Sequence, residues 1–224
     1  MSTIEAHRAQ DASPVAGLSA LAVLVLFVVN MTTWFAMLDW DTKSSDPDTF
    51  LTHVVHHVGL WRLSQVADFL SYVAIVPLVV VMWDRAGRRG VAAATATIGG
   101  LSFAVVGGAG AVALLGLWGH LFVVHGSPAS LEVFRASWYV VPRAIWNCFD
   151  AFVLGIWLVW AGDLARRHGG RTGVLGIATG VFALADSIGF MAGLESFAIV
   201  AQIAFGIGLA VWLGCVARRE LLVT

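Results

Sequence analysis

Polar and charged residues recur at helical spacing inside long apolar stretches of this chain, where they are costly to insert. Arg143, Asn147 and Asp150 occupy positions i, i+4 and i+7 of one such stretch, which would place them on one face of an α-helix. An ionisable residue inside a membrane span costs about 2.5–3.5 kcal/mol on insertion scales, so it marks a polar partner or a function. This spacing predicts a polar helix face that binds a small ligand or an ion.

Two further apolar stretches carry matching groups. Gln65, Asp68 and Tyr72 share one face of the first, and Asp186 lies within the second. We expect Arg143 to contact Asp68 or Asp150, because a guanidinium at that depth always carries charge and needs a carboxylate. Three aspartates outnumber this arginine, so at least one carboxyl still needs a proton, an ion or water. The candidate ligand-binding residues are Gln65, Asp68, Tyr72, Arg143, Asn147, Asp150 and Asp186, and Asn30 and Gln202 could join them.

Two interpretations of these residues remain open. In the first, they line an outward-facing polar cavity that binds a small polar ligand, an ion or a proton. In the second, they form a paired network that locks the helices together and binds nothing.

A histidine cluster suggests different chemistry. Five of the seven histidines lie in two segments, and the candidate metal ligands are His53, His56, His57, His120 and His125. If residues 53–57 are helical, His53 and His57 lie one turn apart, a spacing that suits two imidazoles on one metal ion. Asp46, Asp48 and Glu132 are available as further ligands or as groups that orient the imidazoles. Zinc, copper or a haem would suit this set, and a pH-sensing cluster or histidines that merely decorate the membrane interface are the alternatives.

The stretches that carry these residues are long enough to cross a membrane. Of the 224 residues, 59% are hydrophobic and 12% charged, a composition that requires the bilayer as solvent. A lone strand in lipid leaves its backbone groups unpaired, so the spans are helices. The sequence predicts an all-α, polytopic membrane protein, a single domain over residues 1–224 with six transmembrane helices at about 15–38, 62–83, 91–118, 138–162, 173–194 and 198–217.

The distribution of basic residues predicts the orientation of the six spans in the membrane. Nine of them follow every second span or precede the first: Arg8, Arg85, Arg88, Arg89, Arg166, Arg167, Arg171, Arg218 and Arg219. The opposite side holds four, Lys43, Arg62, Arg135 and Arg143. Because cytoplasmic loops carry the excess of basic residues, both termini are predicted to lie in the cytoplasm, and we expect a multi-pass protein of the cell inner membrane.

Several function classes lack any sequence support. The chain has no Walker sequence, no Gly-x-Ser-x-Gly, no Cys-x-x-Cys and no His-Glu-x-x-His, and a net charge of −1 gives no hint of a nucleic-acid partner. The expected partner is the lipid bilayer. Small residues four apart, as in Gly100–Ala104–Gly108 and Gly176–Gly180, are typical of close helix packing, either within one chain or with a second copy or another membrane protein.

The leading interpretation is a non-enzymatic integral membrane protein that binds a small ligand or ion, or that serves as an accessory membrane subunit. The alternative is a metal- or haem-binding redox or catalytic membrane protein that uses the histidine cluster.

The chain also resembles an uncharacterised family of six-span bacterial membrane proteins. The resemblance rests on Leu60-Trp61-Arg62-Leu63-Ser64-Gln65-Val66-Ala67-Asp68-Phe69-Leu70, and on the stretch from Asn147 through Gly155, Trp157 and Gly162 to Arg166-Arg167 and Leu175-Gly176. It implies the six-helix fold and a bacterial inner membrane, and it implies no activity.

The orientation is testable by cysteine labelling. After replacement of Cys148 and Cys215, single cysteines at positions in 41–52 and 127–133 should react with a membrane-impermeant reagent added outside the cell, whereas positions in 86–90 and 168–171 should not. The reason is the excess of basic residues on the side that holds the second pair of segments. External labelling near Arg88 would reverse the whole topology.

Overall fold

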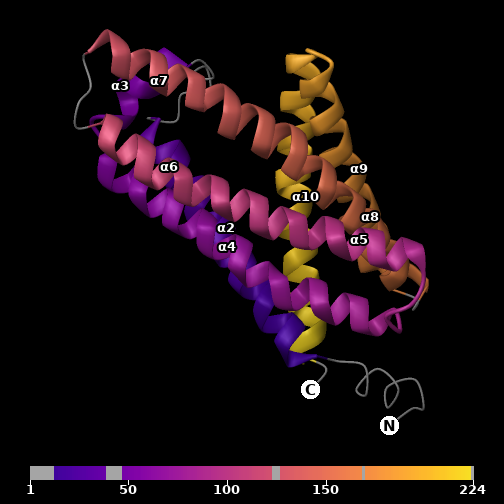
Figure 1. Cartoon of the computed structure of the whole chain (residues 1–224). Coiled ribbons are helices and arrows are strands. Elements are labelled where there is room, and N and C mark those ends of the chain that lie inside the picture. The colour runs from indigo at the N-terminus through magenta and orange to yellow at the C-terminus, as the bar shows by residue number, and fades with distance from the viewer. Residues whose placement is uncertain (1–12, 39–46, 123–126, 168–169, 223–224) are drawn as a thin grey trace.

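The computed structural model describes residues 13–38, 47–122, 127–167 and 170–222, and these form helices and turns with no strand. Six helical segments are long and apolar enough to cross a membrane. The predicted all-α, six-span architecture is therefore confirmed. The helices assemble into an elongated bundle (Figure 1).

Four spans are single α-helices and two are interrupted by a π-helix. The single ones are α2 (Pro14–Met37), α4 (Val58–Arg85), α9 (Arg171–Met191) and α10 (Glu195–Leu222), and a short helix, α3 (Pro47–Val54), precedes α4. The third span joins α5 (Val91–Ser102), the π-helix η1 (Phe103–Gly107) and α6 (Gly108–Leu121). The fourth joins α7 (Pro128–Trp138), the π-helix η2 (Tyr139–Asp150) and α8 (Ala151–Arg167).

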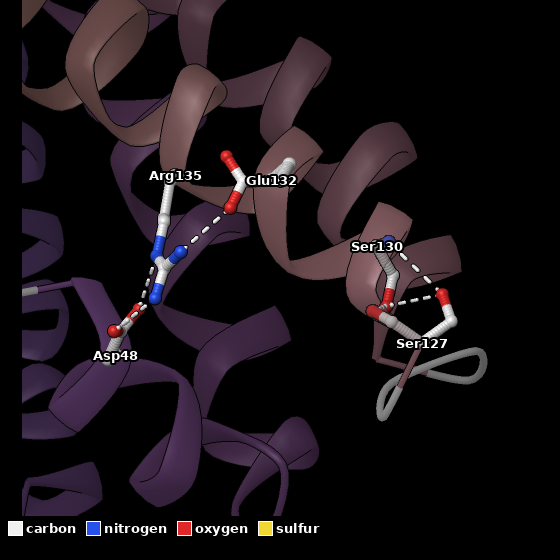
Figure 2. Close-up of polar contacts among 5 residues, drawn as sticks. All are labelled: Asp48, Ser127, Ser130, Glu132 and Arg135. Atoms are coloured by element: carbon white, nitrogen blue, oxygen red, sulfur yellow. Dashed lines mark hydrogen bonds and ion pairs between the residues drawn. The ribbon is translucent and has the colours of Figure 1, made fainter.

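The fourth span begins ten residues earlier than the hydropathy pattern predicts. The hydroxyl of Ser127 accepts a hydrogen bond from the backbone N–H of Ser130 at 3.1 Å, and Pro128 occupies the first helical position. A serine cap followed by proline is a strong helix start, because each supplies what the first turn needs. Figure 2 shows this cap. The helix therefore runs from Pro128 to Arg167 through a segment that we expected to be an outer connection.

The apolar interior is divided into two clusters along the bundle. One, near the ends of the chain, gathers side chains of α2, α4, α8 and α10 such as Leu78, Trp157 and Trp212. The other gathers side chains of α3, α4, α6 and α7 such as Phe50 and Trp118. On α2, α4 and the fourth span, the polar residues of the predicted site lie between the parts that contribute to the two clusters.

Helices α8 and α9 pack with their backbones in contact. A Cβ on Gly162 would lie 2.5 Å from the backbone nitrogen of Ile177, and one on Gly180 would lie 2.7 Å from the carbonyl oxygen of Gly155. These approaches exclude any side chain. The predicted packing role of Gly176–Gly180 is therefore confirmed within one chain.

Glu220, near the end of α10, connects the end of α4 to the start of α2. The Arg85 guanidinium donates two hydrogen bonds to Glu220, at 2.8 and 2.6 Å, and the backbone N–H of Ser13 donates to Glu220 at 2.8 Å. Glu220 is only 2% exposed. It thus caps the start of α2 while it pairs with the end of α4, and Figure 1 shows α2 and α10 meeting there. We call this side, which carries the arginines in or just after the last turns of α4, α8 and α10, the arginine-rich end.

Breaking this contact should destabilise the bundle. Glu220→Gln leaves Arg85 without its carboxylate and should lower the free energy of unfolding by about 2–4 kcal/mol, the range expected when one partner of a largely buried ion pair is lost. Asp84→Asn is the control, because its pair with Arg88 is exposed and should be worth less than about 1 kcal/mol. Denaturation of the two purified variants in detergent measures the difference. Equal decreases in the free energy of unfolding for the two variants would contradict a special role of Glu220 in stability.

Candidate functional site

The first part of the polar site connects α2 to α4. The hydroxyl of Ser64 donates to Asn30 Oδ1 at 2.5 Å, and Asn30 Nδ2 donates to Asp68 Oδ1 at 2.9 Å. Ser64 and Asp68 are one helical turn apart, so one asparagine amide bridges two positions on the same face of α4. The predicted participation of Asn30 is confirmed.

The second part connects α4 to the fourth span. The phenol of Tyr72, one turn beyond Asp68, donates to Asp150 Oδ2 at 3.3 Å. Asp150 is 2% exposed, and its other oxygen, Oδ1, has no hydrogen-bond partner among the described residues. The structure therefore brings together Asp68, Tyr72 and Asp150, as the sequence predicts, and leaves one carboxyl oxygen unsatisfied.

Gly107, at the end of η1, makes this meeting possible. A Cβ at this position would lie 2.1 Å from Tyr72 Cε1 and 2.3 Å from Asp150 Oδ2. Those distances are far inside van der Waals contact, so only glycine lets the third span lie against the Tyr72–Asp150 pair. The π-helices η1 and η2 contact each other here. Single turns of π-helix occur frequently at functional sites.

The π-helix η2 changes which residues share a face. Pro142 lies inside it and has no N–H to donate, so the regular α-helical pattern is interrupted. Bonds from i to i+5 widen the turn, and the spacing argument for Arg143, Asn147 and Asp150 was wrong. Asn147 accepts from Gln202 of α10 at 3.2 Å, whereas Asp150 meets α4.

The predicted pairing of Arg143 with Asp68 or Asp150 was also wrong. Arg143 Nη1 donates to Glu195 Oε1 at 2.9 Å, and its guanidinium carbon lies 5.2 Å from the centre of the Phe190 ring. Glu195 starts α10 and is exposed. Arg143 is two turns from Asp150, so its long side chain reaches a carboxylate at the end of the bundle and avoids the interior.

Two more buried acceptors belong to the predicted set. Asp186 is 2% exposed and Gln65 is 1% exposed, and each has one oxygen without a hydrogen-bond partner among the described residues. Beside Asp186, the hydroxyl of Ser187 donates to the carbonyl oxygen of Cys148 at 2.6 Å, which holds α9 against η2. Within the described segments, no hydrogen bond links Asp186 to the Asp68–Tyr72–Asp150 group.

The histidine segment does not form the helix that we expected. Helix α3 ends at Val54, and the N–H groups of His56 and His57 bond back to His53 and Val54 in a tight turn. His57 is then the cap residue of α4. His53 and His57 therefore belong to different helices, and the i, i+4 argument fails.

The acidic residues near these histidines have another partner. Arg135 binds Asp48 through two hydrogen bonds, at 2.8 and 2.6 Å, and Glu132 through one at 2.8 Å. Figure 2 shows Arg135 between the two carboxylates. The arginine joins α7 to α3, so Asp48 and Glu132, two of the carboxylates that we considered as metal ligands, are engaged in an ion-pair network.

The described part of the chain contains no group of three histidine, cysteine, aspartate or glutamate side chains that could hold a metal ion. His120, at the end of α6, is exposed. His125 and Asp46 lie outside the described residues. Among the residues described, the structure does not supply the predicted ligand set for zinc or copper.

Two cavities lie at the arginine-rich end, of about 130 and about 240 Å³. None of the seven predicted ligand-binding residues lines either of them. The outward-facing cavity therefore stays a prediction. In the polar site as observed, Tyr72 and Asp150 are buried, while Asn30 and Asp68 are partly buried.

Sequence reasoning did not find Ser64 or Gly107. Ser64 could have been found from its position four residues before Asp68, on the same helix face. Gly107 carries no such signal, because glycines are frequent throughout the span and only the position of Tyr72 distinguishes this one.

No protein-family model, curated protein or solved structure matches this chain. The resemblance to a six-span family thus stays a prediction, and the function has to be inferred from the site itself.

Gly107→Ala should disturb the site selectively. The added methyl forces Tyr72 and Asp150 apart, and overpacking of this kind costs about 1–3 kcal/mol. Gly116→Ala, in the same span, is the matched control, because its Cβ would meet nothing within 4 Å and alanine favours the helix. Thermal unfolding in detergent should show a lower midpoint for the first variant only. A Gly107→Ala protein as stable as wild type would show that Tyr72 and Asp150 do not pack as described.

Proposed function

We propose that the protein is a multi-pass protein of the cell inner membrane, with both termini in the cytoplasm, that binds a proton or a small monovalent cation at buried carboxyl groups. Asp68 and Asp150 form the main site, with Tyr72 between them, and Asp186 provides a separate buried carboxyl. We narrow the predicted small ligand or ion to a proton or a small monovalent cation because Asp150 and Asp186 are each only 2% exposed.

The unsatisfied carboxyl oxygens carry this proposal. Asp150 Oδ1 and Asp186 Oδ1 are buried without a partner among the described residues. Leaving a buried polar atom unpaired costs about 1–3 kcal/mol, and more for a charged group. A bound proton or cation removes that cost directly.

The arginines supply no compensating charge in the interior. Arg143 pairs with Glu195, and Arg85 pairs with Glu220. Among the described residues, no ion pair joins a basic side chain to Asp68, Asp150 or Asp186. Two neighbouring carboxylates in an apolar medium repel strongly, so a shared positive charge lowers the energy of the pair.

Polar residues of α4 extend the site from Asp68 toward the start of that helix. Ser64 and Gln65 lie about one turn from Asp68, toward the start of the helix, and both are buried. Hydrogen-bonding groups in this order form a route for an ion or proton from the side opposite the arginine-rich end. That side is the outside in the predicted topology.

Two measurements on the purified protein test the proposal. Infrared spectroscopy detects the carbonyl stretch of a protonated carboxyl, and thermal unfolding at constant ionic strength in sodium, potassium or choline chloride detects a bound metal cation. Wild type should show either the protonated-carboxyl band or a higher midpoint in one alkali cation. Asp150→Asn and Asp186→Asn should each reduce that signal.

Asp84→Asn is the matched control, since Asp84 is exposed and pairs with Arg88; it should behave as wild type. A wild-type protein with no protonated-carboxyl band and equal midpoints in all three salts would contradict the proposal. So would aspartate variants that retain the full signal.

A further inference from the structure

A small cavity lies where the ends of four spans meet at the arginine-rich end. It measures about 130 Å³ and is lined by parts of α4, α8, α9 and α10. Its polar lining comes from Arg85, Thr172, Trp212, Arg219 and Glu220. None of these residues belongs to the carboxyl site in the bundle interior.

Trp212, one of the lining residues, carries a buried donor beside this cavity. Trp212 is 1% exposed, and its indole N–H has no hydrogen-bond partner among the described residues. A Cβ on Gly176 would lie 2.8 Å from Trp212 Nε1, so the nitrogen lies against α9, one turn from Thr172. Buried indole N–H groups usually find an acceptor, and here the described residues supply none.

Arg219 and Thr172 also bring donors to the lining. Arg219 is half-buried and has no hydrogen-bonded or ion-paired partner in the segments that the structure describes. Thr172 stands in the first turn of α9, which no side chain caps. Helix N-termini favour anions because their N–H groups and dipole point outward.

The one acidic group of the cavity is already satisfied. Glu220 accepts two hydrogen bonds from Arg85 and one from the Ser13 backbone. With two guanidinium groups and one carboxylate, the lining has a formal charge of +1. The cavity thus combines a net positive charge, the Arg219 guanidinium and the uncapped first turn of α9, a set that suits an anion with several oxygens.

We propose that this cavity binds a phosphate group, from an anionic phospholipid or from free phosphate. Arginine matches phosphate oxygens with paired N–H donors. The volume equals the share of about four water molecules in the liquid, so a phosphate fits while lipid chains would remain outside along the helices. The cavity lies at the ends of the spans, where basic pockets between membrane helices bind lipid head groups.

The test compares ligands and matched arginine variants. The purified full chain in detergent is heated with phosphatidylglycerol, with phosphatidylcholine or with inorganic phosphate, and the shift of the unfolding midpoint gives the binding. Wild type should be stabilised by phosphatidylglycerol or by inorganic phosphate, and not by phosphatidylcholine. Stabilisation by phosphatidylglycerol alone identifies the lipid as the source, and stabilisation by inorganic phosphate identifies the free anion.

Arg219→Gln should weaken the effective ligand by about fivefold, the contribution of one arginine near an anionic head group. Arg218→Gln removes the same charge from an exposed neighbour outside the cavity and should leave binding unchanged. If Arg219→Gln does not fold, Thr172→Val serves as the second test. Valine is nearly equal in shape to threonine and lacks the hydroxyl, so this variant should also weaken binding. The proposal is overturned if neither ligand stabilises wild type, if phosphatidylcholine acts as well as phosphatidylglycerol, or if Arg218→Gln loses as much binding as Arg219→Gln.

Discussion

The need to satisfy polar groups in a medium without water governs this structure. In a bilayer, an unpaired donor or acceptor cannot turn to solvent, so each polar side chain in the interior has to meet another. Asn30 meets both Ser64 and Asp68, and Tyr72 meets Asp150. These contacts form a polar layer between two apolar clusters. The layer ties α2, α4 and the fourth span at one depth, and the oxygens that it leaves unpaired are where we place the function.

Glycine decides how closely the spans approach this layer. At Gly107 the third span rests on the Tyr72–Asp150 pair with no room for a Cβ, and at Gly162 the backbones of α8 and α9 touch. Between membrane helices there is no hydrophobic driving force, so van der Waals contact of this closeness supplies much of the attraction. Replacing glycine by alanine therefore affects stability differently at different positions of one span, depending on which atoms of the neighbouring helix face that position.

Charge pairs occupy the ends of the spans. Arg135 joins α7 to α3, Arg143 reaches the start of α10, and Arg85 binds Glu220 near the end of α10. Full charges are cheapest near the membrane surface, where water and head groups still screen them. Ion pairs therefore connect the spans at their ends, and hydrogen bonds to carboxyl groups connect them in the interior of the bundle. At the arginine-rich end this leaves more guanidinium groups than carboxylates, which is the basis of the phosphate site that we infer.

The sequence by itself determined the six helical spans and pointed to Asp68, Tyr72 and Asp150 among the residues of the interior. Both follow from local properties: a run of about 20 apolar residues crosses a membrane whatever surrounds it, and an aspartate within such a run needs a partner. Tertiary structure alone decided which partner each residue meets. The π-helix around Pro142 separated Asp150 from Arg143 and Asn147, and the turn after Val54 separated His53 from His57. Spacing along the sequence predicts a shared face only when the helix is regular and continuous. Its regularity depends on contacts from distant parts of the chain, such as those that Tyr72 and Gly107 make with Asp150.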